Sequence, residues 1–370
     1  MVMLTDSLDV KGLHLRNRLV MAPMVTGLAV GSAPTEAQIH WYRVRARGGV
    51  GLVVVEAAAI AADATLLPFS LGIWDDAQVP GLARLAQGIQ AEGVPAVLQI
   101  VHGGARAWRA EVEAERIGPS PVPIMAGPAP REMTEADIAA VIEGFAQAAR
   151  RARQAGFDGV ELHAAHYYLL CQFLSPYTNQ RTDRWGGDRS GRIRLLLEVV
   201  RAVRAAVGDS YPLFCRMHGL ELMDGGLSTE DAIYYAQSLE AAGIDLLDVS
   251  GIGSSGQGQW RGQSYLNASS VLPKDAEPGT FAPFAGRIKA AVGIPVITVG
   301  KLGWPGAAQQ VLDHGQADLV ALARTLIADP QAPTKMLTGH GDEVDQCQEC
   351  LACFGAIRKG PVRCSVNKTL

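Results

Sequence analysis

The sequence lacks the features that would direct a chain to a membrane or to nucleic acid. Among its 370 residues there is no run of 18 apolar residues, and no positively charged start precedes an apolar stretch. The formal net charge of −4 is spread along the chain, which favours neither nucleic acid nor an anionic membrane surface as a partner. We therefore expect a cytoplasmic protein that acts on a small molecule and is compatible with a homo-oligomer.

Charged residues are also scarce. Asp, Glu, Lys and Arg make up 19% of the chain against 48% hydrophobic residues, which is ample for a large core and gives no sign of disorder. The length is high for one domain, but (β/α)8 barrels of this size are common.

Cysteine is rare except near the end of the sequence, where four of the six fall within the last 24 residues. Cys171 and Cys215 stand alone in apolar contexts, whereas a disulfide framework would spread cysteines through a small secreted chain. The clustered set has the spacing C-x2-C-x2-C-x10-C and comprises Cys347, Cys350, Cys353 and Cys364. Three thiolates at three-residue intervals suit one corner of a [4Fe–4S] cluster, with the fourth arriving from beyond a turn. Zinc, which usually takes well-separated C-x2-C pairs, is the alternative.

Short apolar runs alternate with amphipathic helical stretches, a pattern that indicates parallel βα units. Thr134 and Ser228, each with an acid three residues on, are typical helix starts. The eight expected strands cover residues 19–22, 50–57, 96–100, 159–163, 212–217, 246–250, 295–299 and 319–323. Eight such units predict an α/β fold, a closed (β/α)8 barrel, rather than an open doubly wound sheet.

Three connections are long, over residues 102–133, 164–190 and 251–284, and all follow strands. They would lie on the C-terminal face of the barrel, where such enzymes build their sites. The last is rich in Gly, Ser and Gln and contains Trp260 and Tyr265. We interpret it as a mobile substrate cover, with a plain surface loop as the alternative.

Side chains capable of proton chemistry follow the fourth expected strand. His163, His166 and Tyr168 fall within six residues at the end of an apolar strand, which favours a catalytic site over histidines that only satisfy a turn. Gly300 and Lys301 follow the seventh strand and Arg324 the eighth, where barrels often bind phosphate. These positions favour a phosphate-bearing cofactor.

Several motifs resemble the Old Yellow Enzyme family of FMN-dependent oxidoreductases over residues 1–335. They are RNRLVMAPM at 16–24, LQI at 98–100, HAAHYYLLCQFLSP at 163–176, NQRTDRWGG at 179–187 and ALARTLIADP at 321–330. The cysteine-containing continuation is similar to the branch that holds bacterial 2,4-dienoyl-CoA reductase and trimethylamine dehydrogenase. Those relatives continue into a half that binds FAD and a nicotinamide nucleotide, but no G-x-G-x-x-G fingerprint follows a strand in this sequence.

The resemblance implies an FMN-binding barrel over residues 1–338 and a [4Fe–4S]-binding segment over 339–370. It places the isoalloxazine against Pro23, Met24 and Ala57, its polar edge at Gln99 and Arg216, and the phosphate at Gly300, Lys301 and Arg324. Val25 stands where relatives have a Thr or Cys, so FMN should be held without a covalent bond.

The resemblance further implies hydride transfer from N5 of FMN to an activated C=C bond. His163 and His166 would bind the substrate oxygen and Tyr168 would donate the proton. The alternatives are an N-methyl amine dehydrogenase that passes electrons out through the cluster, and a non-catalytic electron-transfer flavoprotein. A hydrolytic metal site at the two histidines is disfavoured by the flavin motifs around them. NAD(P)H would supply electrons directly or through a separate reductase or ferredoxin, unless the cluster is structural.

Overall fold

A computed structural model describes residues 2–110, 113, 115–252, 254–269 and 271–369. The side chains of residues 254–256, 260, 268 and 269 lie outside this description, so the expected part of Trp260 in a substrate cover is not addressed.

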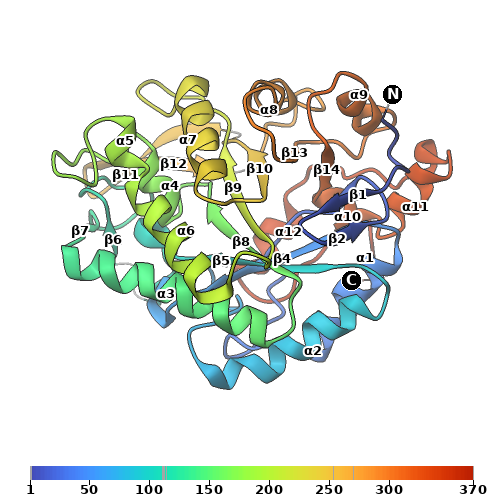
Figure 1. The fold of residues 1–370 in the computed structure, drawn as a ribbon, viewed down its shortest axis with the longest axis horizontal. Coiled ribbons are helices and arrows are strands. Elements are labelled where there is room, and N and C mark those ends of the chain that lie inside the picture. The colour runs from blue at the N-terminus through green and yellow to red at the C-terminus, as the bar shows by residue number, and fades with distance from the viewer. Residues whose placement is uncertain (1, 111–112, 114, 253, 270, 370) are drawn as a thin grey trace.

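Eight parallel strands form a closed barrel in the order β10-β13-β14-β3-β4-β5-β8-β9 (Figure 1). They are β3 (Leu19–Met21), β4 (Leu52–Ala59), β5 (Ala96–Val101), β8 (Gly159–Ala164), β9 (Leu213–His218), β10 (Leu246–Ser250), β13 (Val296–Val299) and β14 (Leu319–Leu322). Each coincides with an expected strand to within two residues at either end. The prediction of a (β/α)8 barrel is therefore confirmed.

Helices cover the outside of the barrel (Figure 1). The helices of the described residues are α1 (Glu36–Arg47), α2 (Val79–Gln90), α3 (Glu135–Gln154), α4 (Leu169–Leu174), α5 (Arg189–Arg192), α6 (Arg194–Val207), α7 (Thr229–Ala241), α8 (Ala282–Lys289), α9 (Ala307–Asp313), α10 (Arg324–Ala328), α11 (Ala332–Leu337) and α12 (Ala352–Ile357). In α6 the buried side chains recur every three to four residues, which gives the helix one apolar stripe against the barrel. Thr134 and Ser228 begin α3 and α7, and both form the expected capping boxes, with Asp137 and Asp231.

Toward the N-terminal ends of the strands, the barrel interior is filled by side chains. Val20, Leu52, Val97 and Phe214 belong to one buried cluster there. The antiparallel hairpin of β1 (Leu8–Val10) and β2 (Leu13–Leu15) adds Val10 and Leu15 to the same cluster. Because this end is packed, only the C-terminal ends of the strands are available to build a site.

The three long connections contain more regular structure than the sequence suggested. Residues 102–133 include the short parallel pair β6 (Ile117–Gly118) and β7 (Arg131–Glu132), and residues 164–190 include α4. Residues 251–284 include the antiparallel hairpin of β11 (Ser254–Trp260) and β12 (Gln263–Ser269).

The hairpin is tied to the connection after β5. The Leu266 N–H donates to the Pro123 carbonyl at 3.0 Å, and Leu266 packs with Ile124, Tyr167 and Cys171. The two connections therefore form one cover, defined here as residues 120–126 together with β11 and β12.

The cysteine-containing C-terminal segment packs directly on the barrel. Val362 is buried in the main core cluster, and its N–H donates to the Thr26 carbonyl at 2.8 Å. The Asn367 side chain donates to the Ile327 carbonyl at 3.2 Å. A boundary at residue 338 stays a prediction.

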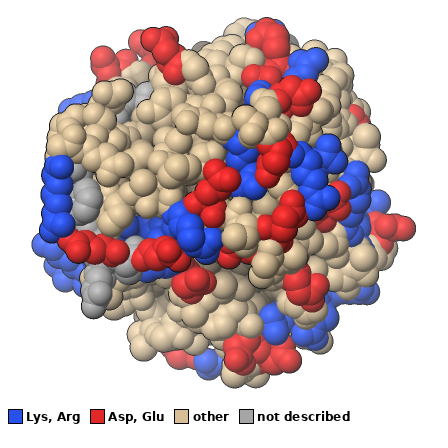
Figure 2. Space-filling view, turned by 90° about the vertical axis from the view of Figure 1, so that its left-hand side faces the viewer, with Lys and Arg blue, Asp and Glu red and all other residues tan. Residues whose placement is uncertain are grey.

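Basic and acidic side chains are interleaved on the face shown in Figure 2, rather than gathered into regions of one sign. Among the described residues, none of the helices combines the length and the apolar character that crossing a bilayer requires.

Candidate active site

A cavity of about 620 Å³ opens at the C-terminal ends of the barrel strands. Its lining includes all eleven residues that the sequence predicts for substrate and FMN. These are His163, His166, Tyr168, Pro23, Met24, Ala57, Gln99, Arg216, Gly300, Lys301 and Arg324. The structure thus brings the predicted residues together, while their individual roles stay predictions.

His163 lies near the end of β8, and His166 and Tyr168 lie in the turn that follows it. The ring centroids of His163 and His166 are 5.1 Å apart, and those of His163 and Tyr168 are 4.8 Å apart. The Ala165 N–H donates to His163 Nδ1 at 3.3 Å, so a neutral His163 carries its proton on Nε2. His166 Nε2 lies 3.0 Å from the Ser250 hydroxyl.

Both histidines are neutral. Burial, followed by the positive charge of Arg216, holds the pKa of His163 and of His166 well below the usual range. A neutral imidazole N–H donates a hydrogen bond to a carbonyl oxygen without adding a buried positive charge.

The turn that carries these residues has an unusual backbone. His166 and Tyr167 have φ values of +58° and +54°, the left-handed region that costs a residue with a Cβ about 1–2 kcal/mol. Arg106 lies over the Tyr168 ring at 5.3 Å from its centroid, and its Nη1 donates to the His166 carbonyl at 2.5 Å. The surrounding contacts therefore hold a conformation that the local sequence does not favour.

Two buried acids lie beside the expected flavin contacts and were missed by sequence reasoning. Gln99 Nε2 donates to Glu161 Oε1 at 2.7 Å, and Arg216 Nε forms an ion pair with Asp248 Oδ2 at 3.2 Å, although not with hydrogen-bond geometry. Burial, with the nearby Asp248 charge, raises the pKa of Glu161 to about 8. An acid in the middle of an otherwise apolar strand was the available signal.

The expected phosphate end of the cavity contains two cationic side chains. One has a nitrogen without a hydrogen-bond partner, and the other forms an ion pair. Among the described residues, Arg324 Nη1 is buried without a hydrogen-bond partner. Gly300 has φ +127°, which a residue with a Cβ rarely adopts. Lys301 Nζ instead lies 2.9 Å from Glu349 Oε2. A guanidinium nitrogen that is buried without a partner fits a phosphate group, which would accept its hydrogen bond.

The four clustered cysteines line one small cavity together with Arg324 and Ser365. The Glu349 N–H donates to Cys347 Sγ and the Val366 N–H to Cys364 Sγ, each at 3.4 Å. Backbone N–H groups directed at sulfur are the contacts that support metal-bound thiolates. The donor set therefore fits an iron–sulfur cluster. Cys347 and Cys353 also line the large cavity, so the two sites adjoin.

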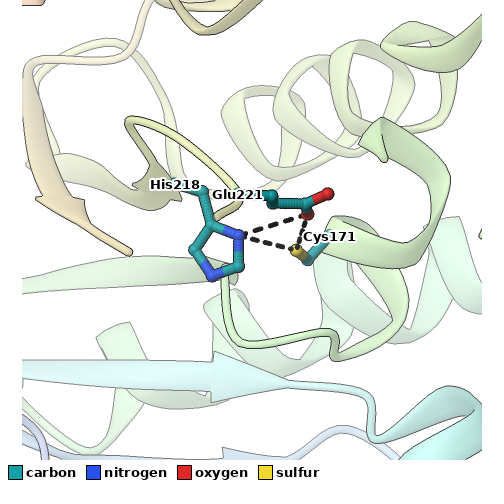
Figure 3. Close-up of side chains that lie close together, drawn as sticks. All are labelled: Cys171, His218 and Glu221. Carbon is teal, nitrogen blue, oxygen red and sulfur yellow. Dashed lines mark hydrogen bonds and ion pairs between the residues drawn. The ribbon is translucent and has the colours of Figure 1, made fainter. Parts of the chain in front are cut away.

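A third polar cluster lies behind His166 and gives Cys171, whose sequence neighbours are mostly apolar, polar partners in the fold. Cys171, His218 and Glu221 point toward one another from α4, the end of β9 and the following loop (Figure 3). His218 Nδ1 is 3.3 Å from Glu221 Oε1 and 3.6 Å from Cys171 Sγ, and all three residues are buried.

The eight-stranded barrel gathers histidines, a tyrosine and basic residues around one cavity at its strand ends, where barrel enzymes build their sites. Residues 4–343 match the NADH:flavin oxidoreductase / NADH oxidase family. The chain belongs to this family, which is an oxidoreductase family, and the predicted resemblance is confirmed at that level.

Individual relatives agree with the family assignment. The chain is 40% identical to a metal reductase of Desulforamulus reducens over 358 residues, covering 96% of this chain and 52% of that protein. It is 39% identical to an NADPH dehydrogenase of Geobacillus thermodenitrificans over 331 residues, covering 87% and 90%. A solved 2-naphthoyl-CoA reductase complexed with 2-naphthoyl-CoA aligns with a TM-score of 0.89 and 30% identity, covering 98% and 56%. The chain thus spans about half the length of the metal reductase and the 2-naphthoyl-CoA reductase.

Proposed function

We propose that the protein is an FMN- and [4Fe–4S]-dependent reductase of an activated C=C bond in an enone or enoyl substrate. The observation that carries the proposal is the pair of histidines beside Tyr168 in the main cavity, His163 buried and His166 half-buried, both with a pKa held well below the usual range. FMN, when bound, supplies hydride from its N5 to the substrate β-carbon.

The chain's own residues have complementary tasks. His163 presents its Nε2–H and, with His166, binds the carbonyl oxygen on which negative charge develops. Tyr168 donates a proton to the α-carbon. Arg216 places a positive charge at the flavin end of the cavity, and Asp248 partly balances it. Arg324 and the backbone at Gly300 hold the phosphate.

Cys347, Cys350, Cys353 and Cys364 would hold the cluster, a proposal supported by their common cavity and the N–H groups directed at two of the sulfurs. We expect about four irons and four sulfides per chain. Because the cysteine site adjoins the flavin site, the cluster would carry single electrons between a separate reductase or ferredoxin and the flavin.

The reaction can be tested on protein purified without oxygen. Denaturation should release intact FMN, since Val25 has no sulfur with which to bond it. In a separate experiment on the native protein, 2-cyclohexen-1-one should reoxidise the dithionite-reduced flavin. Trimethylamine should not reduce the oxidised flavin. Reduction of the oxidised flavin by trimethylamine, without reoxidation by the enone, would instead establish the amine dehydrogenase alternative.

The cluster's role has its own test. Cys353→Ser should abolish acceleration of flavin reduction by an added ferredoxin or reductase while sparing turnover with chemically reduced FMN. Cys215→Ala, which changes a buried thiol outside the set, is the matched control. Fast direct reduction by NADH or NADPH that survives loss of the cluster would contradict the electron-transfer role.

A further inference from the structure

The backbone of His166 is held by side chains on both sides. The His166 N–H donates to His218 Nε2 at 2.7 Å, and the His166 carbonyl accepts from Arg106. The next carbonyl, of Tyr167, accepts from Gln172 Nε2 at 2.6 Å. Since His166 and Tyr167 are both in the left-handed region, these bonds determine where the His166 imidazole points.

The hydrogen bond to His166 determines which ring nitrogen of a neutral His218 carries the proton. Because Nε2 accepts a hydrogen bond, a neutral His218 must carry its proton on Nδ1. Nδ1 faces Glu221 Oε1 at 3.3 Å, which accepts that proton's hydrogen bond.

Glu221 is itself held in place. Its Oε2 accepts from the Ser175 hydroxyl at 2.7 Å and from the Leu227 N–H at 2.9 Å. Three donors, the Nδ1–H of His218, the Ser175 hydroxyl and the Leu227 N–H, therefore face the Glu221 carboxyl group, so the residue acts as a hydrogen-bond acceptor.

The same three side chains have spacings that would also suit a tetrahedral metal ion, since Cys171 Sγ lies near both His218 and Glu221 (Figure 3). A metal bound to His218 Nδ1 would require the ring proton to move to Nε2. That proton would then face the N–H of His166 at a nitrogen separation of 2.7 Å. Two donors cannot face each other at this distance, so the geometry favours a hydrogen-bonded chain over a metal site.

We propose that His218, with its proton kept on Nδ1 by Glu221, is a positioning residue that holds the His166 backbone and so aims the His166 imidazole at the substrate oxygen. The role of His166 rests on the proposed function, whereas the hydrogen-bonded chain Glu221–His218–His166 does not.

The chain can be tested without any substrate. In protein labelled with nitrogen-15 histidine, NMR should show His218 protonated at Nδ1 and unprotonated at Nε2, with the signal assigned by its loss in His218→Gln. An Nε2–H form would overturn the proposal. So would one equivalent of zinc per chain that disappears in Cys171→Ser.

The positioning role can be tested in FMN-loaded, oxidised protein with 4-hydroxybenzaldehyde, whose stacking on flavin is followed by long-wavelength absorbance. His218→Leu removes the acceptor and should weaken binding by about tenfold or more, as expected when a buried donor loses its partner. His218→Gln can place an amide oxygen near the Nε2 position and should restore most of the affinity. Cys171→Ser should bind as the parent does.

Parental affinity in His218→Leu with full FMN content would overturn the positioning role. If that variant does not fold, the same measurement is made on the isosteric Glu221→Gln variant. Its side chain is no longer a carboxylate that keeps the His218 proton on Nδ1. This variant should then bind the aldehyde more weakly than the parent, and unchanged binding would contradict the proposal. A parent that held FMN but bound no phenol would refute the proposed function, while the NMR result would still decide the hydrogen-bonded chain.

Discussion

Lys301 and Glu349 form a buried ion pair between the connection after β13 and the cysteine-containing segment. Lys301 Nζ lies 2.9 Å from Glu349 Oε2, and the side chains are only 4% and 9% exposed. Lys301 Nζ also donates to the Lys274 carbonyl at 2.7 Å. Since Lys301 is an expected phosphate contact and Glu349 lies between Cys347 and Cys350, the pair joins the two expected cofactor sites.

Glu349→Gln should destabilise the flavin-free protein and strengthen its binding of FMN. Removing one partner of a buried ion pair costs up to about 3–5 kcal/mol, because the remaining charge is left without compensation. A phosphate would supply that compensation, so thermal unfolding should show a larger stabilisation by FMN than in the parent. Riboflavin, which has no phosphate, is the control ligand. An equal change for both flavins would place Lys301 away from the phosphate.

Arg324→Ala should reduce FMN affinity by the ~1.5–3 kcal/mol expected of a charged hydrogen bond, and should affect riboflavin far less. Its buried Nη1 has no hydrogen-bond partner among the described residues, so little else is lost with it. The dissociation constants can be measured by quenching of flavin fluorescence. Similar losses for the two flavins would show that Arg324 acts elsewhere.

Tyr168→Phe should slow enone reduction by ~10²–10⁴-fold, the usual effect of losing one positioned proton donor, and leave flavin reduction nearly unchanged. His166→Ala should instead weaken the binding of phenols as well as turnover. Rapid-mixing measurements separate the two half-reactions. A Tyr168→Phe protein that reduces enones at the parental rate would mean that another group donates the proton.

Glu161→Gln should change the pH dependence of stability. A folded-state pKa of about 8 means that the folded protein keeps the Glu161 proton while the unfolded chain, with a pKa of about 4.3, has lost it. The contribution of this proton to the free energy of unfolding is fully present below about pH 4.3. It decreases by up to about 1.4 kcal/mol per pH unit until about pH 8.

The Glu161→Gln variant has no titratable proton at this position. The free energy of unfolding of the parent should therefore fall relative to that of the variant as the pH rises. Denaturant unfolding of both proteins between about pH 5 and pH 8 measures it. Contributions of the other buried groups cancel in the difference if they titrate alike in both proteins. A constant difference would show that Glu161 is ionised throughout.

Much of the fold and of the cavity lining could be predicted because both depend on local patterns. Strand 159–164 begins with glycine, is apolar apart from Glu161 and His163, and is followed within four residues by His166 and Tyr168, which is enough to place His163 at a barrel mouth. Lys301 shows the limit: its position after β13 was predicted, but its ion pair with Glu349, 48 residues away, was not. His218 and Glu221 likewise contact Cys171 and His166 only because β8 and β9 are neighbours in the barrel. Side-chain pairs of this kind depend on tertiary packing, which no single stretch of sequence contains.

The cover formed by residues 120–126 with β11 and β12 has a consequence for the timing of catalysis. Leu266 and Ile124 belong to one buried cluster with Tyr167, the residue between His166 and Tyr168. The cover therefore cannot lift away without removing apolar support from the turn that holds both side chains. Under the proposed function, departure of product and loosening of this turn would be a single event, so the protein would release its product in a state that is less able to protonate a carbanion, and would regain that ability on closing over the next substrate.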